Sequence, residues 1–250
     1  MILEVEKLSK SFGGLHAVRD VSLTVRQGTI HSILGPNGAG KTTLFNLVTG
    51  ALTPSSGVVR VMGQDVTGWT PNALVYRGLA RTFQRTSIFP SISVADNVKL
   101  SLRSRRRLNS ALRLPKRIVD ELEGETRRIL AMVGLTEHAD TRAGQMSHGS
   151  QHALDIGIGL ALSPQILLMD EPLAGMSQGD RERIGSVILS LRNEHGLTVL
   201  MVEHDVDLVM RLSDTVTVMQ QGCVIAEDEP GAIKRSPVVR KAYLVGEFAG

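Results

Sequence analysis

The chain has 250 residues, of which 42% are hydrophobic and 21% are charged. This composition is ordinary for a globular protein and argues against collagen-like, disordered and disulfide-scaffold classes. The longest apolar run covers residues 156–162, whereas a membrane-spanning helix needs about twenty apolar residues. The N-terminus lacks the basic start and apolar middle of an export signal, and Cys223 is the single cysteine. We therefore expect a soluble cytoplasmic protein with one large domain, or one domain with an insert.

The charge of the chain is unevenly distributed. The formal net charge is +3, but the segment from Lys99 to Arg117 carries eight basic residues and no acidic residue. Such a segment forms a solvated helix face, a patch that meets anionic lipid headgroups, or a nucleic-acid contact. It contains no aromatic residue, so the stacking platform of single-strand binders is missing. We favour the solvated helix face and expect no nucleic-acid partner.

Three short apolar runs predict buried strands, at residues 29–34, 166–169 and 198–202. Each run ends in glycine or polar residues, as strands do where they enter loops. Between the second and third runs, apolar residues recur at helical spacing from Ile184 to Leu191, which predicts an amphipathic helix. A strand, a helix and a strand in this order form a crossover. The sequence therefore predicts an α/β fold with a parallel sheet and polar chemistry at the carboxyl ends of its strands.

The two ends of the chain show the alternation typical of half-buried strands. It covers residues 3–5 and 21–25 near the N-terminus, and residues 216–219 and 223–225 near the C-terminus. We expect these strands to form a small antiparallel sheet beside the parallel one. From about residue 70 to residue 162 the pattern becomes helical, which predicts an inserted helical subdomain.

One segment fits the phosphate-binding pattern G-x-x-x-x-G-K-[ST] in full. The candidate nucleotide-binding residues are Gly35, Pro36, Asn37, Gly38, Ala39, Gly40, Lys41 and Thr42, with Thr43 next in the predicted helix. The segment follows a predicted strand and opens a helix, which is the context that the pattern requires; a chance glycine-rich turn is the alternative. The glycines let backbone N–H groups converge on phosphate oxygens, Lys41 neutralises phosphate charge, and the Thr42 hydroxyl is a ligand for Mg²⁺.

Two adjacent acids, Asp170 and Glu171, end the apolar run at 166–169. Neighbouring carboxylates at the tip of a strand near a phosphate loop need different roles. We expect Asp170 to belong to the Mg²⁺ shell and Glu171 to polarise the water that attacks the γ-phosphate. The alternative is a strand that ends in two solvated acids. Together with the phosphate loop, the pair indicates nucleotide hydrolysis rather than binding alone.

A phosphate loop by itself leaves kinases, GTPases, motors and helicases open. Residues 146–150, directly before a helical run, are similar to the L-S-G-G-Q signature of ABC ATPases, with Ser147 and Gly149 at the matching positions. A serine hydroxyl and a glycine amide at a helix N-terminus form a second anion site. An ordinary helix cap explains the same residues.

Three further positions resemble motifs of the same family. Gln84 resembles the Q-loop glutamine, His204 the switch histidine after the next strand, and Phe12 the aromatic residue that stacks on adenine. Taken one at a time, the three residues are typical of a loop amide, a strand-end histidine and a core aromatic. Their order and spacing, however, match the family over nearly the whole chain. The resemblance implies binding of ATP and Mg²⁺. It also implies that Gln84 senses Mg²⁺ and water and that His204 holds the γ-phosphate.

The ABC ATPase resemblance implies a P-loop NTPase fold with a mixed, mainly parallel core sheet, a small antiparallel β subdomain and an inserted α-helical subdomain. The expected domains are an ATP-binding core in residues 1–84 plus 163–235, a helical subdomain with the signature in 85–162, and a C-terminal extension in 236–250. In this family two ATPase subunits meet head to tail, and each phosphate loop faces the signature of its partner.

The departures from the family pattern resemble one branch, the ATP-binding subunits of importers for branched-chain amino acids and related amides or urea. The signature departs at Met146, His148 and Ser150. Ser177 stands where an aspartate is common, after an Ala-Gly-Met turn at 174–176, and the segment 240–244 reads Arg-Lys-Ala-Tyr-Leu. An exporter ATPase for a lipid-linked glycan and a soluble ABC ATPase acting on ribosomes or DNA ends are the alternatives.

The importer branch implies particular partners and a location. The partners are a second ATPase subunit, identical or different, two transmembrane permease subunits and an extracytoplasmic substrate-binding protein. The chain is then a peripheral subunit at the cytoplasmic face of the inner membrane.

Overall fold

The computed structural model describes residues 1–82, 88–108 and 113–243. One sheet is antiparallel, with its strands in the order β2-β1-β4-β5. Its strands are β1 (Leu3–Phe12), β2 (Leu15–Val25), β4 (Ser56–Val61) and β5 (Gln64–Asp65). The expected antiparallel strands at residues 3–5 and 21–25 thus belong to β1 and β2, and β4 was not foreseen.

The central sheet has the order β10-β9-β3-β8-β7-β6. Its strands are β3 (Ile30–Leu34), β6 (Leu79–Arg81), β7 (Ile166–Asp170), β8 (Thr198–Val202), β9 (Thr215–Gln220) and β10 (Cys223–Asp228). All neighbours pair in parallel except β9 with β10. β3, β7 and β8 are buried along their whole length, which explains why they are mainly apolar, although β3 also buries His31 and Ser32.

The C-terminal hairpin lies in a different sheet from the one that its alternation predicts. We expected β9 and β10 to join the small antiparallel sheet, and this expectation was wrong. β9 instead pairs in parallel with β3, with His31 opposite Thr215 and Leu34 opposite Val218. Alternation reports which residues of a strand face a core, but it does not report which strand lies beside it.

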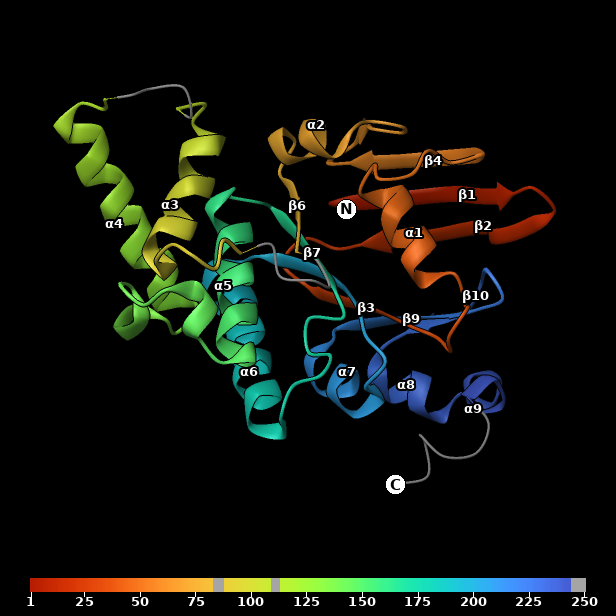
Figure 1. Cartoon of the computed structure of the whole chain (residues 1–250). Coiled ribbons are helices and arrows are strands. Elements are labelled where there is room, and N and C mark those ends of the chain that lie inside the picture. The colour runs from red at the N-terminus through yellow and green to blue at the C-terminus, as the bar shows by residue number, and fades with distance from the viewer. Residues whose placement is uncertain (83–87, 109–112, 244–250) are drawn as a thin grey trace.

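The helices cover both faces of the central sheet. They are α1 (Lys41–Val48), α2 (Pro71–Tyr76), α3 (Val94–Arg105), α4 (Lys116–Met132), α5 (His148–Ala161), α6 (Gln178–His195), α7 (Val206–Leu212), α8 (Pro230–Arg235) and α9 (Pro237–Tyr243). Figure 1 shows α3, α4 and α5 gathered on one side of the molecule and the strands β1, β2 and β4 on the other. The predicted helical stretch also contains the short strand β6, and the predicted domain limits stay a prediction.

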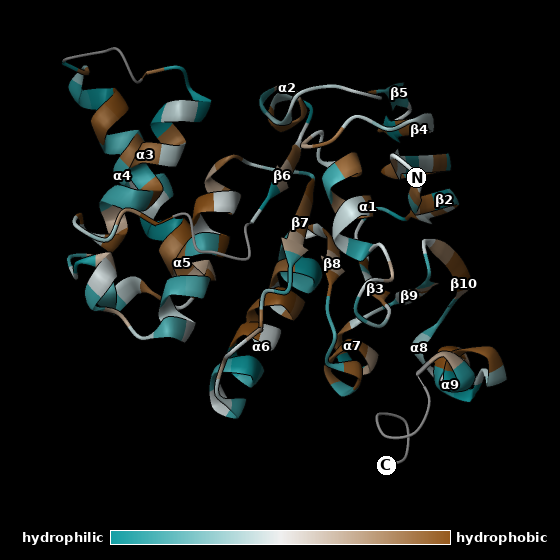
Figure 2. Ribbon diagram, turned by 45° about the vertical axis from the view of Figure 1, so that its right-hand side comes forward, coloured by the Kyte–Doolittle hydropathy of each residue, from teal (hydrophilic) through white to brown (hydrophobic). Residues whose placement is uncertain are grey.

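Two hydrophobic cores lie on opposite faces of the central sheet. Ile33 and Leu168 pack with α1 and the antiparallel sheet. Leu34 and Leu167 point the other way and pack with the helices from α3 to α8. Successive side chains of a strand face opposite sides, so one buried strand contributes to both cores. Figure 2 shows the corresponding hydrophobic residues along the central strands and the mixed hydropathy of α4.

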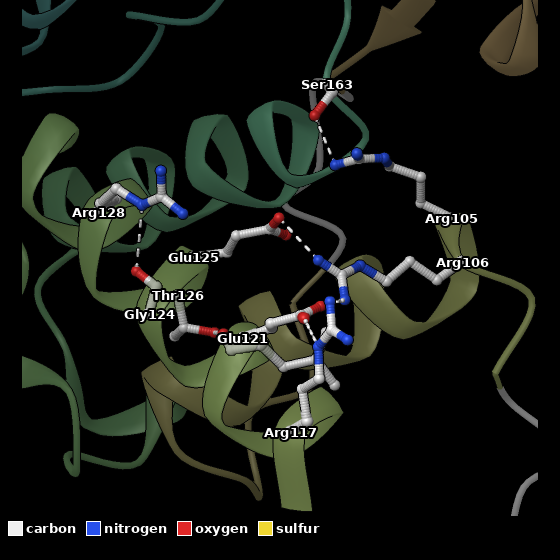
Figure 3. Close-up of polar contacts among 10 residues, drawn as sticks. Arg105, Arg106, Arg117, Glu121, Gly124, Glu125, Thr126, Arg128 and Ser163 are labelled. Carbon is white, nitrogen blue, oxygen red and sulfur yellow. Dashed lines mark hydrogen bonds and ion pairs between the residues drawn. The ribbon is translucent and has the colours of Figure 1, made fainter. Parts of the chain in front are cut away.

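The basic segment 99–117 is partly engaged in contacts within the chain. Arg106 of α3 pairs with Glu121 and Glu125 of α4, at 3.1 and 2.8 Å. Arg105 donates a hydrogen bond to the hydroxyl of Ser163. Figure 3 shows how these arginines reach from α3 toward α4 and toward the end of α5. Several of the basic side chains therefore join helices to one another.

No helix in the described part of the chain is long and apolar enough to span a bilayer.

His31 gives the fold a pH-dependent stability. Its side chain lies buried on β3, and Nε2 is 2.7 Å from the hydroxyl oxygen of Thr217. Burial, helped by the charge of Arg26, lowers the pKa of His31 from 6.5 to about 4. The unfolded chain therefore takes up a proton below pH 6.5, while the folded chain stays neutral at this position until about pH 4.

We expect the free energy of unfolding to fall by up to about 3 kcal/mol between pH 6.5 and 4 because of His31. The measurement is urea unfolding at several pH values, with His31→Gln as the comparison. The stability advantage of the original chain over the variant should shrink as the pH falls through this window. A difference that is the same at pH 7 and pH 4 would contradict the assignment.

Candidate active site

The loop between β3 and α1 is held by close backbone packing. A Cβ atom on Gly35 would lie 2.4 Å from the carbonyl oxygen of Met219, and one on Gly40 would lie 2.5 Å from that of Ala17. Gly40 also has φ 98°, a left-handed conformation that favours glycine. The Gly222 N–H donates to the Ala39 carbonyl at 2.9 Å. The two glycines thus let β2 and the end of β9 approach the loop closely.

Lys41 lies at the N-terminus of α1 and points back over the loop. Its side chain is 7% exposed. Nζ donates hydrogen bonds to the carbonyls of Gly35 and Pro36, the second at 3.1 Å. Burial lowers the pKa of Lys41, and the charges of Glu171 and Asp170 oppose this effect. Lys41 therefore lies within electrostatic reach of both acids.

A pocket of about 570 Å³ opens above the loop. Its lining consists of residues 37–43, Leu15, His16, Ala17 and Arg19 of β2, Glu171, and the turn Gln221–Gly222. A volume of this size is typical of small-molecule and cofactor sites. The structure thus brings most of the predicted loop residues together with Glu171. Gly35 and Pro36 contribute through their carbonyls, which accept from Lys41.

The two acids at the end of β7 have different environments. Asp170 is 5% exposed, and its Oδ2 accepts from the guanidinium of Arg81 at 2.7 Å. Glu171 lines the pocket, and its backbone has φ 49°, which is rare for a residue with a side chain. The Glu171 N–H donates to the Val202 carbonyl at 2.9 Å, which fixes this strained residue to β8.

Arg81 was not foreseen as a site residue. It ends β6, 89 positions before Asp170. Besides Asp170, its guanidinium donates to Asn46 at 2.7 Å and to the Thr49 hydroxyl at 3.2 Å, both in or next to α1. Arg81 therefore joins the acidic end of β7 to the helix that follows the phosphate loop. A basic residue that ends an apolar strand was the available signal in the sequence.

The residues present fit Mg²⁺ bound together with a nucleotide. Mg²⁺ prefers oxygen ligands and is commonly held by one or two protein groups plus substrate phosphates. Thr42 lines the pocket with its neighbours, and Asp170 presents a carboxylate at the adjacent strand end. No group of three or more His, Cys, Asp or Glu residues suited to a metal occurs in the described residues. Thr42 and Asp170 are the residues that would hold Mg²⁺ beside the phosphates of a bound nucleotide.

The predicted signature residues begin α5. The Ser147 hydroxyl accepts from the Ser150 N–H at 3.3 Å, so Ser147 is a helix N-cap. A Cβ atom on Gly149 would lie 2.4 Å from Oδ1 of Asp180, so a larger residue where α5 meets the start of α6 would require the Asp180 side chain to move. Neither residue is among the described residues that line the pocket.

Three other predicted positions differ in how the structure places them. His204 lies shortly after the end of β8, and its side chain is 60% exposed. Phe12 is 47% exposed, and Nζ of Lys10 lies 5.3 Å from its ring centroid. On that side the described pocket lining comes from Leu15 and His16 rather than from Phe12. Gln84 lies outside the described residues.

Glu203 is a second residue that sequence patterns did not reveal. It is 1% exposed, and burial raises its pKa. Its carboxylate accepts from the N–H groups of Leu173 and His204. An acid placed between a buried strand and a candidate histidine was the signal that could have indicated it.

A phosphate loop between a parallel strand and a helix, with two acids at the end of another strand of the same sheet, defines a P-loop nucleotide hydrolase. Residues 18–174 match the family described as ABC transporter. The chain therefore belongs to the ABC transporter family, as its signature and loop motifs indicated, and it is an ATP-binding ATPase cassette.

Similar proteins cover the whole length of the chain. The high-affinity branched-chain amino acid transport ATP-binding protein BraF of Pseudomonas aeruginosa is 38% identical over 97% of both chains. LivG of Salmonella typhimurium, which carries the same description, is 36% identical over 97% of both chains. A crystal structure of an ATP-binding cassette of an ABC transporter in its ADP conformation has a TM-score of 0.85 and 31% identity, covering 97% of this chain and 98% of that one.

We expect Arg81→Met to lower the free energy of unfolding by about 3 kcal/mol, because it leaves the buried Asp170 carboxylate without its partner. Chemical denaturation measures the change. In the double variant Arg81→Met with Asp170→Asn, part of the loss should return, since the buried carboxylate that lost its guanidinium partner is gone. The control is Arg60→Met, whose partner Glu6 is 54% exposed and whose loss should cost at most about 1 kcal/mol. Equal losses in the two single variants would contradict this account.

Proposed function

We propose that the chain is the ATP-hydrolysing subunit of an importer for branched-chain amino acids or related amides or urea. The observation that carries ATP hydrolysis is one pocket that joins Lys41 and the phosphate loop to Glu171. The solute class is supported by relatives that match the chain from end to end and are described as branched-chain amino acid transport proteins.

We propose a separate task for each group in or near the pocket. The N–H groups of residues 37–43 and the N-terminus of α1 bind the phosphates, and Lys41 neutralises their charge. Thr42 and Asp170 hold Mg²⁺. Gln84, which is not among the described residues, is proposed as a further Mg²⁺ ligand. When bound, Mg²⁺ neutralises charge that builds up on the phosphate oxygens. Glu171 accepts a proton from the attacking water.

The remaining predicted residues are proposed to bind the nucleotide as well. His204 is proposed to hold the γ-phosphate, and Phe12 to stack on the adenine. Ser147 and Gly149 stand at the N-terminus of α5, away from the pocket of their own chain. We therefore propose that they bind the triphosphate held by a second ATPase subunit, identical or different.

The complex is proposed to contain two permease subunits and, outside the membrane, a substrate-binding protein. The ATPase subunit then lies at the cytoplasmic face of the inner membrane. Affinity purification of the tagged chain from detergent-solubilised membranes tests this arrangement. We expect two permeases to co-purify, and recovery of ribosomal RNA in their place would contradict it.

Glu171→Gln should lower kcat by about 10²–10⁴-fold, because the amide cannot take the proton of the attacking water. The affinity for ATP should stay within about twofold, since the phosphate contacts remain. Steady-state hydrolysis and equilibrium binding of a fluorescent ATP analogue measure the two quantities. ATP-bound dimers should accumulate in size-exclusion chromatography. Near-normal turnover would remove Glu171 from this role.

Lys41→Ala should instead weaken ATP binding by about 10–100-fold, because the loss of a charge-assisted phosphate contact costs about 1.5–3 kcal/mol. The same binding assay measures the effect. Unchanged affinity in this variant would show that the loop does not hold the phosphates through Lys41.

A further inference from the structure

Glu203 is a buried carboxylate that bridges two loops at the edge of the central sheet. It directly follows β8 and is 1% exposed. Oε1 accepts from the N–H of Leu173 at 3.1 Å, and Oε2 accepts from the N–H of His204 at 3.2 Å. Nδ1 of His204 lies 3.9 Å from the same Oε2. The carboxylate thus contacts the segment after Glu171 and the segment that carries His204.

Burial of this acid is costly unless its oxygens are bonded. Moving a carboxylate away from water is unfavourable by several kcal/mol, and hydrogen bonds from N–H groups offset part of that cost. Burial raises the pKa of Glu203, the two N–H bonds and His204 lower it, and the negative charge of Glu171 raises it further. An apolar side chain would avoid this cost but would leave the N–H groups of Leu173 and His204 without their acceptor. The acid therefore joins the two loops as well as filling space.

The two bonds act on residues next to the reacting groups. Leu173 is two positions after Glu171, whose φ of 49° is maintained by the bond from its N–H to Val202. Glu203 adds a second attachment on the other side of Glu171, through Leu173. The short segment from Glu171 to Leu173 is therefore attached to β8 at both of its ends.

We propose that Glu203 is a positioning residue for ATP hydrolysis, whose carboxylate aligns Glu171 and His204 with each other. This inference rests on the roles proposed above for those two residues. Displacement of a reacting group by about 1 Å can reduce a rate by about 10²-fold. Loss of the bridge should therefore slow the chemical step, while Lys41 and the phosphate loop, which the substitution does not alter, keep their contacts with ATP.

Two substitutions at this position remove the acceptors in steps. Glu203→Gln keeps the shape and one carbonyl oxygen, whereas Glu203→Met keeps the approximate volume and has no oxygen. We expect kcat to fall by about 10-fold in the first and about 10²-fold in the second, with KM and the dissociation constant for ATP within about twofold. A role in packing alone would not separate kcat from KM in this graded way.

Asp205 provides the matched control. It lies two positions further along the same loop, where it caps α7 through the N–H of Leu208 and pairs with Arg181 at 2.9 Å. Asparagine caps helices as well as aspartate does, and the ion pair is partly exposed, at 40% for the Arg181 side chain and 28% for that of Asp205. Asp205→Asn should therefore change kcat by less than about threefold, since it keeps the helix cap and leaves the bridge made by Glu203 in place.

The Glu203 variants and Asp205→Asn are assayed as full-length chains with saturating Mg-ATP. Glu171→Gln and His204→Ala are assayed in parallel. Hydrogen exchange followed by mass spectrometry reports the two bridged segments directly. Exchange in residues 171–176 and 203–206 should speed up in both Glu203 variants and stay unchanged in Asp205→Asn. Circular dichroism and thermal melting establish that each variant is folded.

The outcomes separate this inference from the proposed function. If Glu171→Gln is inactive while both Glu203 variants keep normal kcat, the inference alone is overturned. It is also overturned if the variants raise KM at constant kcat, or if neither folds, because Glu203 then serves affinity or stability. Turnover by Glu171→Gln would overturn the role of Glu171 and this inference with it.

Discussion

The parallel pairing of β3 with β8, and of β8 with β7, determines where the candidate site residues at the ends of these strands lie. The three strands are buried on both faces, so their register is fixed by two cores at once. Their carboxyl ends meet at one edge, and there the chain presents the phosphate loop, the pair Asp170 and Glu171, and the segment of Glu203 and His204. The chemistry therefore depends on apolar packing that itself contains no reactive group.

Features encoded by neighbouring residues were predictable from the sequence. The buried strands are recognisable in the sequence as mainly apolar runs. The phosphate loop and the acidic pair are contiguous motifs. Pairing between distant strands has no such local signal. Nothing in residues 216–225 reveals that β9 lies beside β3, and the short strand β6 has only Leu79 and Ala80 to mark its burial. The strand β6 was accordingly hidden within a helical stretch.

The same distinction holds for the site. The pattern from Gly35 to Lys41 is recognisable by itself, and Gly35 and Gly40 are required by the close approach of other backbone segments. Arg81 and Glu203 act instead through partners 89 and 30 positions away. Their side chains are ordinary in the sequence, and their importance appears only when the strand ends are brought together. Both residues connect parts of the site that the motifs describe separately.

The contact between Gly149 and Asp180 has a consequence for the start of α6. A Cβ atom at position 149 would overlap the Asp180 side chain, so a larger residue there would push that side chain away from α5. The Asp180 carboxylate accepts a hydrogen bond from the hydroxyl of Ser177 at 2.8 Å, and Ser177 is the N-cap of α6. The absence of a side chain at position 149 therefore leaves the first turn of α6 undisturbed where the two helix ends meet.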